Sequence, residues 1–372
     1  MEFNIQRSIL LAGIRKTLGI VEKKTTMPIL NNVLIKAHDT GITIIATDIE
    51  ITLVANYNAE ILSEGEVTLS AKKLYEMMRE IPEGIVHVKK GSGNLLTISC
   101  EKAVYRINSI PADDFPSVAE DGGALYFKIN REELVNLIYK SFFAISTDDT
   151  RPNLTGAFFE VDRKDVNNII LRMVGTDGHR LAMVEYAVQG EFLTLDKGVI
   201  IPRKGLLEIK RLLEENTGDI FVGVHQGKCI VKGQDIFLKV NLIDAEFPDY
   251  RRVIPQEQGI VIKFEKDKVV HALKLVNVIS SEGYGGLIIS LKDNIMSLTS
   301  TDPDVGDASD EINVAYGGKD LTVGYNIEYL LNAIEVIDEG EVRFEIGEGS
   351  KPSVIKGEGN NHYLCIVMPL KT

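Results

Sequence analysis

An internal repeat in three copies constrains this sequence more than any other feature. Each copy opens with a short β-type alternation followed by apolar residues at helical spacing, starting at Phe3, Phe127 and Ile262. A Thr-Asp pair recurs in each copy, at Thr47-Asp48, Thr176-Asp177 and Thr301-Asp302, with successive threonines 129 and 125 residues apart. Repeated modules favour an extended or closed surface, whereas a single catalytic pocket rarely needs them.

Each copy also contains a second helical stretch and further β-type alternation. The helical stretches cover residues 71–79, 204–213 and 327–337, and turn signals such as Gly91-Ser92-Gly93 separate the strands. This pattern predicts an α+β fold in which each repeat packs two helices on antiparallel strands. Glycine-bearing breaks near 121–123 and 255–259 place the predicted domains at 1–121, 127–253 and 260–372. Three unrelated domains of similar size are the alternative.

Composition is that of an ordinary globular protein. Of the 372 residues, 44% are hydrophobic and 26% are charged, and apolar runs such as Ile9–Ile14 are far too short to span a membrane. The first residues lack the basic and apolar segments of a secretory signal, so we expect a cytoplasmic location. Cys100, Cys229 and Cys365 lie far apart, which predicts buried thiols and neither a disulfide framework nor a zinc cluster.

The net charge of −13 by itself argues against a nucleic acid partner. Screening weakens that argument, because the Debye length is only about 8 Å at physiological salt. Acidic residues on one surface therefore have little effect on a basic surface elsewhere. The distribution of charge matters more than its sum.

The run Thr176-Asp177-Gly178-His179-Arg180 brings an acid close to a histidine, as a hydrolase or metal site could. The Asp-Gly pair lies between two apolar alternations, however, and that pattern is typical of a β-hairpin turn. Phosphate-binding loops, dinucleotide fingerprints and paired CxxC motifs are absent from the sequence. The hairpin is the favoured interpretation, with an enzyme that uses Asp177 and His179 as the alternative.

Three motifs carry a family resemblance. They are Thr176-Asp177-Gly178-His179-Arg180-Leu181-Ala182, Phe247-Pro248-Asp249-Tyr250-Arg251-Arg252-Val253 and the terminal Val367-Met368-Pro369-Leu370. With Met27-Pro28-Ile29-Leu30 and Pro202-Arg203-Lys204-Gly205, they occur in the expected order along the whole chain. The sequence resembles the beta subunit of bacterial DNA polymerase III.

The resemblance implies a sliding clamp and processivity factor with no catalytic site, cofactor or metal. Three clamp-type domains in each of two head-to-tail chains would form a six-domain ring around double-stranded DNA. Ring topology would retain the protein, while phosphate contacts with dissociation constants of about 10⁻⁴ to 10⁻⁶ M would let it slide without reading sequence. The implied partners are duplex DNA, a second copy of the chain, a clamp loader, the polymerase α subunit and other polymerases or repair proteins, with no membrane. A repeat-built scaffold without nucleic acid is a further alternative.

The resemblance also implies a cleft between the second and third domains that accepts hydrophobic peptide tails. The matching positions are Leu154, Thr176, Gly178, His179, Arg180, Leu181, Pro248, Arg252, Val253, Tyr284, Asn326, Tyr329, Met368, Pro369 and Leu370. Apolar walls would bury the peptide, and a few polar groups would orient it. Leu181, Val253 and Leu370 could instead be ordinary core residues.

The helices of each repeat would line the DNA channel. The candidate phosphate contacts are Lys24, Lys72, Lys73, Arg79, Arg151, Arg203 and Lys204. Arg15, Lys16, Lys140 and Lys266 are further basic candidates. For each of these residues, an ordinary solvated role is the alternative. The last helical stretch is a poor match to a basic lining, because it carries Glu328, Glu335 and Asp338.

Overall fold

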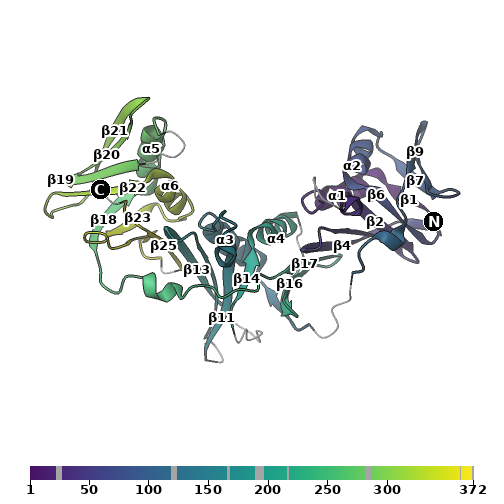
Figure 1. Cartoon of the computed structure of the whole chain (residues 1–372), viewed down its shortest axis with the longest axis horizontal. Coiled ribbons are helices and arrows are strands. Elements are labelled where there is room, and N and C mark those ends of the chain that lie inside the picture. Colours follow the sequence, from purple (N-terminus) through teal and green to yellow (C-terminus); the bar gives the residue numbers. More distant parts are fainter. Residues whose placement is uncertain are drawn as a thin grey trace. The chain divides into compact units, whose positions relative to one another are not determined.

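The computed structural model describes residues 1–21, 27–118, 124–165, 168–188, 197–215, 218–280, 286–360 and 362–370. Contacts divide the chain into two compact units (Figure 1). Unit 1 comprises Met1–Arg131 and Lys204–Leu242, and unit 2 comprises Glu132–Arg203 and Ile243–Thr372. Both units therefore contain part of the second repeat.

The first copy of the repeat runs through β1 (Glu2–Gln6), α1 (Arg7–Thr17), η1 (Pro28–Asn31), β2 (Asn32–His38), β3 (Gly41–Thr47), β4 (Ile51–Asn58), β5 (Glu60–Ser63), β6 (Gly65–Ser70), α2 (Ala71–Glu80), β7 (Ile85–Lys90), β8 (Leu95–Cys100), β9 (Ala103–Asn108) and η2 (Ala112–Asp114). The second copy runs through β10 (Tyr126–Ile129), α3 (Arg131–Phe142), η3 (Pro152–Leu154), β11 (Gly156–Asp165), β12 (Asn168–Thr176), β13 (Arg180–Val188), β14 (Val199–Pro202), α4 (Arg203–Glu215), β15 (Ile220–His225), β16 (Lys228–Lys232), β17 (Ile236–Asn241) and η4 (Tyr250–Val253).

The third copy runs through β18 (Ile260–Glu265), α5 (Lys266–Asn277), β19 (Gly286–Lys292), β20 (Ile295–Asp302), β21 (Gly306–Asn313), β22 (Leu321–Asn326), α6 (Ile327–Glu335), β23 (Glu341–Ile346), β24 (Ser353–Gly357) and β25 (Tyr363–Val367). All three copies thus follow one order: a strand, a helix, several strands, a second helix and three closing strands. The predicted α+β repeat with two helices on antiparallel strands is confirmed.

Amphipathic patterning explains why these helices form where they do. In α2, the Ser70 side chain accepts a hydrogen bond from the Lys73 N–H (3.4 Å) and caps the first turn. Leu74 and Met78, four residues apart, are 1% and 0% exposed, whereas the lysines at 72 and 73 face solvent. One face of the helix is therefore fixed by burial and the other is free to carry charge.

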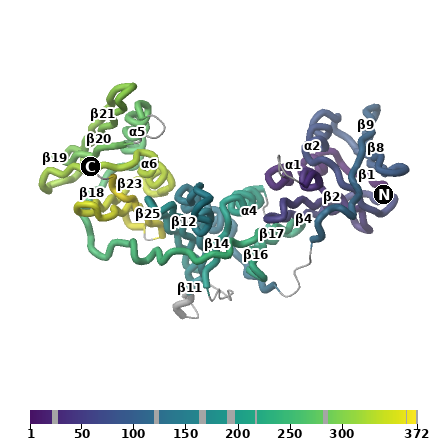
Figure 2. The backbone as a smooth tube through the Cα atoms, viewed as in Figure 1, coloured from purple at the N-terminus to yellow at the C-terminus, as the bar shows by residue number. Residues whose placement is uncertain are grey.

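Two of the sheets combine strands from successive copies of the repeat. In unit 1, the order is β10-β15-β16-β17-β4-β3-β2-β6, with β17 of the second copy antiparallel to β4 of the first. Figure 2 shows β17 beside β4. In unit 2, the order is β14-β11-β12-β13-β25-β24-β23-β18, with β13 antiparallel to β25 of the third copy. These shared sheets explain why the compact units do not coincide with the repeats.

Each of the two remaining sheets is built from a single copy of the repeat and ends in edge strands. The sheet β5-β1-β7-β8-β9 ends at β9, and the sheet β21-β20-β19-β22 ends at β21. Neither β9 nor β21 has a second neighbour within the described part of the chain. An open edge presents unpaired N–H and C=O groups to another strand.

The three cysteines are buried free thiols, as predicted. Burial raises the pKa of the Cys229 and Cys365 thiols to about 12. Among the described residues, no helix has the length and apolar character needed to cross a membrane.

Candidate functional site

The turn between β12 and β13 is held by its own side chains. The Thr176 hydroxyl donates to the Arg180 carbonyl (2.7 Å) and accepts from the Gly178 N–H (3.1 Å). One Asp177 oxygen accepts from the N–H groups of His179 (2.9 Å) and Arg180 (3.0 Å), and the other accepts from the Arg180 Nε (3.0 Å). Gly178 has a φ of +91°, which favours glycine. The predicted hairpin is confirmed, and both Asp177 oxygens serve its turn.

The Arg180 side chain lines a cavity in unit 2. Its guanidinium carbon lies 4.3 Å from the ring centre of Tyr329 on α6 and 5.3 Å from that of Phe143, within the range of cation–π attraction. The cavity has a volume of about 330 Å³ and is also lined by His179, Arg151 and Arg203. The structure thus brings residues expected to bind peptide and residues expected to bind DNA to one cavity.

The C-terminal segment lies beside this turn. β25 pairs with β13 so that Val367 is opposite Arg180. Beyond β25, the Met368 N–H donates to the His179 carbonyl (2.9 Å) and the Leu370 N–H donates to the Gly324 carbonyl (2.8 Å). Met368 and Leu370 remain 40% and 46% exposed. Their backbones are fixed, but their apolar side chains are available for contact, and Pro369 lies between them.

The other apolar cleft candidates differ in burial. Val253 at the end of η4 is 47% exposed, whereas Leu154 and Leu181 are 6% and 3% exposed. Pro248 and Arg252 lie at the surface on the segment around η4. Leu154 and Leu181 therefore belong to the core beneath the surface, and Val253 offers direct apolar contact. The core interpretation describes Leu181 but not Val253.

Asn326 has a local role whatever it binds. Its side chain accepts a hydrogen bond from the Tyr329 N–H (3.2 Å), which caps the first turn of α6 and fixes the start of the helix that carries Tyr329. Tyr284 lies outside the described residues, and so does Lys24 of the DNA set.

Several residues of the DNA set have acidic or aromatic partners. Lys73 pairs with Glu76 (2.9 Å), and Lys72 lies 4.0 Å from the same carboxylate, although both lysines stay well exposed. The Arg79 guanidinium lies 5.9 Å from the Tyr75 ring centre. Such exposed contacts contribute little and are easily exchanged. These three basic residues therefore remain accessible to a phosphate.

Other basic residues are more firmly engaged. Arg203 donates to the Ile145 carbonyl (3.3 Å) and stacks on Phe142 (4.2 Å), and burial, with a contribution from Arg180, lowers its pKa. Arg151 pairs with Asp148 (3.2 Å). Lys204 binds the buried Asp48, and Lys140, only 4% exposed, pairs with Asp338 (2.6 Å). Lys140 therefore forms a structural ion pair and is too buried to contact a phosphate.

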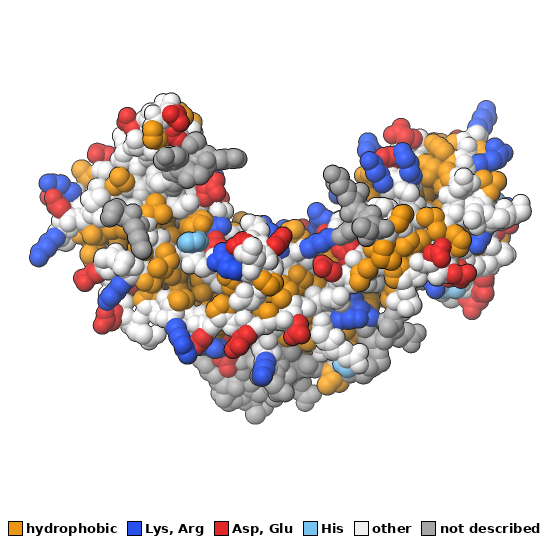
Figure 3. All heavy atoms as spheres, in the orientation of Figure 1, with side chains coloured by type: hydrophobic (Ala, Val, Ile, Leu, Met, Phe, Trp, Pro, Cys, Tyr) orange, Lys and Arg blue, Asp and Glu red, His pale blue; other side chains and the backbone are white. Residues whose placement is uncertain are grey.

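Charge is mixed on the face shown in Figure 3, where Lys and Arg side chains alternate with Asp and Glu side chains. Among the described residues, no three His, Cys, Asp or Glu side chains gather as metal ligands do.

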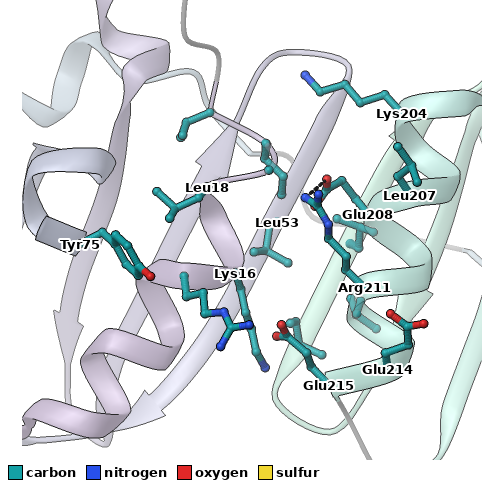
Figure 4. Close-up of a pocket in the computed structure, with 17 residues that line it drawn as sticks. Lys16, Leu18, Leu53, Tyr75, Lys204, Leu207, Glu208, Arg211, Glu214 and Glu215 are labelled. Carbon is teal, nitrogen blue, oxygen red and sulfur yellow. Dashed lines mark hydrogen bonds and ion pairs between the residues drawn. The ribbon is translucent and has the colours of Figure 1, made fainter. Parts of the chain in front are cut away.

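A second cavity, of about 940 Å³, lies in unit 1 (Figure 4). Lys16 and Leu53 line one side, and Leu207, Glu208 and Arg211 of α4 line the other. Glu208 pairs with Arg211 (2.7 Å), and burial raises the Glu208 pKa. Charges of both signs face this cavity, so it has no clear preference for a phosphate.

Two sets of residues, one at the first cavity and one beneath the segment of Val253, were not identified from the sequence. Phe143 follows α3 directly, and no sequence pattern places it against Arg180. Glu160 and Arg172 lie behind the segment that carries Val253, in strands that read as simple alternation. Contacts across strands are not visible in a single sequence.

Comparison with known families covers the chain from end to end. Models of the DNA polymerase III beta subunit match residues 1–119 with the N-terminal domain, 128–249 with the central domain and 251–371 with the C-terminal domain. The beta sliding clamp of Pseudomonas aeruginosa is 31% identical over 373 residues, and that of Caulobacter vibrioides is 30% identical, with 100% of each chain covered in both comparisons.

Solved structures agree in fold. The DNA polymerase III subunit beta of Pseudomonas aeruginosa aligns with a TM-score of 0.92 at 31% identity, and the polymerase sliding clamp of Caulobacter crescentus aligns with a TM-score of 0.93 at 30% identity. Both alignments cover 100% of each chain. The chain therefore belongs to the DNA polymerase III beta subunit family, the bacterial sliding clamps, which act as processivity factors and not as catalytic polymerase subunits.

Proposed function

We propose that two copies of this chain join head to tail into a ring of six domains that encloses duplex DNA and tethers the replicative polymerase to it. The domains within each chain are 1–121, 127–253 and 260–372. Support for these boundaries comes from the breaks in the repeat and from the family models, which match residues 1–119, 128–249 and 251–371. The protein would act in the cytoplasm, at the nucleoid.

The observation that carries the ring is the pairing of strands between successive copies. β4 of the first copy pairs with β17 of the second, and β13 of the second pairs with β25 of the third. By repeat equivalence, the third junction joins β21 to β9, and both are open sheet edges. If β21 pairs with β9 of another chain, a second such junction closes the ring.

Repeat equivalence also gives a register for this third junction. In the first two copies, the strand that pairs across the junction begins opposite a valine of the next copy. Ile51 of β4 is opposite Val240 of β17, and Arg180 of β13 is opposite Val367 of β25. In the third copy, the corresponding strand β21 begins at Gly306. The partner strands also correspond: β9 ends at Asn108, which is opposite Leu95 at the start of β8, and β17 ends at Asn241, which is opposite Lys228 at the start of β16.

The equivalent of Val240 in β9 is therefore Ile107. Antiparallel pairing of Gly306 with Ile107 then places Asp307 opposite Arg106 and Ser309 opposite Val104. Opposite charges at directly paired positions are favourable.

A cysteine cross-link tests the ring and its register together. Val104→Cys with Ser309→Cys places two thiols at paired positions, where a disulfide can form. The control pair, Val104→Cys with Ala308→Cys, points the thiols to opposite faces. We expect mild oxidation to give a covalently closed dimer for the first pair only. Equal cross-linking of both pairs, or none in a dimeric sample, would reject the register.

The tethering mechanism has its own test. Protein placed on closed circular DNA by a purified clamp loader should stay bound and should be released when the circle is cut. Phosphate contacts by the accessible basic residues, such as Lys72, Lys73 and Arg79, then affect sliding more than retention. Equal retention on circular and linear DNA would exclude topological tethering.

We further propose that the exposed apolar residues Val253, Met368 and Leu370, together with the 330 Å³ cavity lined by Arg180 and His179, bind the tails of the polymerase α subunit, the clamp loader and other partners. Exposed Val253, Met368 and Leu370 supply apolar contact, while Arg180 and His179 supply orientation. A fluorescein-labelled peptide with the C-terminal tail of the organism's polymerase α subunit serves as the probe. Val253→Asp should abolish its binding, and unchanged affinity would place the peptide elsewhere.

A further inference from the structure

The segment that joins the second and third copies carries three of the cleft residues: Pro248, Arg252 and Val253. Within this segment, the only regular element in the described structure is η4 (Tyr250–Val253). Its backbone does not join a sheet there, so side chains must fix its position. The position of these side chains decides where Val253, an exposed apolar contact, is presented.

A row of charged side chains on three neighbouring strands lies against this segment. Glu160 of β11 is directly opposite Arg172 of β12, which is directly opposite Glu185 of β13. Arg172 donates to Glu160 through Nη1 and to Glu185 through Nε (2.9 Å). This row crosses the sheet, and its members Glu160 and Arg172 contact the segment through Tyr250 and Arg251.

The Glu160 carboxylate connects the sheet to the segment. One of its oxygens accepts from the Tyr250 hydroxyl (2.5 Å), and both accept from Arg251 Nη2 (2.9 and 3.1 Å). The Tyr250 oxygen in turn accepts from Arg172 Nη1 (3.2 Å). Two successive residues of the segment are thus held by one carboxylate, through charge-assisted hydrogen bonds that are strong and directional.

The same tyrosine is fixed by apolar contact. Its ring packs in a cluster with Val174, Leu181 and Ile366 and is 4% exposed. Next to it, Phe247 stacks on Phe158 with ring centres 4.9 Å apart. Tyr250 therefore contacts Leu181 on one side and carries the segment with Val253 on the other.

These contacts are better suited to positioning than to stability. A buried ion pair is costly to desolvate, and apolar side chains of similar size often stabilise a protein as well or better. What the charges add is a defined geometry, because each hydrogen bond restricts the direction of its partner. The apolar cluster fills the space around the Tyr250 ring, and the hydrogen bonds add a fixed direction for its hydroxyl.

We propose that Glu160, with Arg172 and Tyr250, is a positioning network that holds the Val253 segment in its peptide-binding conformation. This proposal rests on the proposed peptide cleft. Glu160 itself need not touch the peptide, since it acts through Tyr250 and Arg251. The network would set how well the cleft fits an apolar tail, while ring closure and DNA retention would not depend on it.

The test compares three variants in the full-length protein. Tyr250→Phe removes only the hydroxyl, and Glu160→Gln removes the charge. Glu345→Gln is the matched control: Glu345 has the same 12% side-chain exposure and also binds two cationic side chains, Arg343 and Lys356. It lies on β23 of the same sheet. The readouts are the dissociation constant of the labelled polymerase tail, by fluorescence anisotropy, and Tm.

We expect Tyr250→Phe to weaken peptide binding about tenfold, the effect of one charge-assisted hydrogen bond. Glu160→Gln, which weakens the bonds from Tyr250, Arg172 and Arg251, should have at least that effect. Glu345→Gln should lower Tm about as much as Glu160→Gln does and leave peptide affinity unchanged. Combining Tyr250→Phe with Val253→Ala should be non-additive, because both changes act on the same contact with the peptide.

Wild-type affinity in both network variants, or equal weakening in the Glu345 control, would overturn the positioning role. Tyr250→Phe keeps the test decisive if Glu160→Gln folds poorly, because it leaves the apolar packing intact. Failure of the unaltered protein to bind the tail is a different outcome, which would overturn the peptide cleft as well.

Discussion

The turn between β3 and β4 and the turn between β12 and β13 occupy equivalent places in the first and second copies. In the earlier turn, the Thr47 hydroxyl donates to the Ile51 carbonyl (3.0 Å) and accepts from the Ile49 N–H (3.1 Å), and an Asp48 oxygen accepts from the Ile51 N–H (2.6 Å). The turn at Thr176 repeats each of these bonds. One local design therefore serves two different surroundings.

The two turns differ in what the second oxygen of the aspartate binds and in the residue at the apex, which is Ile49 in the first turn and Gly178 in the second. Asp48 binds Lys204 of α4, which covers the first turn with an ion pair. Asp177 binds Arg180 of its own turn, and that arginine stacks on Tyr329 beside a cavity. The same turn thus supports a packed junction in unit 1 and a binding surface in unit 2, according to which side chain the carboxylate orients.

The connecting segments show a parallel contrast. In unit 1, Phe115 packs with the apolar side chains of Ile29, Leu30, Leu34 and Ile45, and the Thr68 hydroxyl donates to the Ile110 carbonyl of the same segment (2.6 Å). In unit 2, the corresponding segment combines apolar packing with the Glu160 network. Both segments are therefore held by apolar packing and hydrogen bonds, and the segment in unit 2 adds charge-assisted bonds to Glu160.

Removing the carboxylate of each turn should separate the two roles most strongly. Asp177→Ala deletes the acceptor of two backbone N–H groups and of Arg180, so we expect roughly hundredfold weaker binding of the polymerase tail. Asp48→Ala should destabilise unit 1 without changing peptide affinity. Anisotropy titrations of both variants make the comparison, and similar losses in the two would mean that the turns are not specialised.

Exchanging the apex residues should have the next largest effect. Ile49 has a φ of 81°, a left-handed conformation that costs a β-branched residue about 1–2 kcal/mol. Ile49→Gly should therefore stabilise the protein, and Gly178→Ile should destabilise it by about 1–2 kcal/mol and weaken peptide binding. Urea denaturation measures both changes in stability, and anisotropy measures the change in peptide affinity. A destabilising Ile49→Gly would show that its exposed side chain has a contact worth more than the strain.

Breaking the ion pair that covers the first turn should have a smaller effect. Lys204→Gln leaves the buried Asp48 without its cationic partner, but the lysine is 39% exposed and water can replace it in part. We expect a loss of about 1 kcal/mol, between an exposed and a buried pair. Hydrogen exchange at the Ile49 and Ile51 amides should quicken, while exchange at the Thr176 turn stays as it was.

Lowering the pH should have the smallest effect. It should loosen the connecting segment of unit 2, which the Glu160 carboxylate holds. Burial raises the Glu160 pKa, but hydrogen bonds from Tyr250 and Arg172 outweigh it and hold the pKa below its ordinary value of 4.5. Because the folded pKa is lowered, this stabilisation is present above pH 4.5 and is lost as pH falls through the folded value. Peptide affinity should decline in that range, less so in Glu160→Gln. An unchanged decline in that variant would assign the effect to other groups.

Local sequence patterns predicted much of this molecule. The second helices were expected at 71–79, 204–213 and 327–337, and the structure has them at Ala71–Glu80, Arg203–Glu215 and Ile327–Glu335. The Asp177-Gly178 turn was also predicted, because its hydrogen bonds join residues close in sequence. The expected peptide-binding positions came from family motifs, and the structure places the Thr176 turn, Tyr329 and the C-terminal segment together.

The basic residues were harder to interpret. Lys140 looked available for DNA, but it is buried against Asp338, almost two hundred positions further along the chain. The Glu160–Arg172–Tyr250 network was invisible for the same reason, since register across strands brings its members together. A charge in a sequence gives no indication of its partner when that partner is distant in the chain.

The sequence by itself determined the threefold repeat, the α+β class, the positions of the second helices and the turn at Asp177-Gly178, because these depend on periodicity and on contacts between near neighbours. Tertiary structure decided which strands of successive copies share a sheet, which lysines and arginines are paired, and how Glu160 holds the Val253 segment. Those outcomes depend on burial and on strand register, which only the folded chain creates.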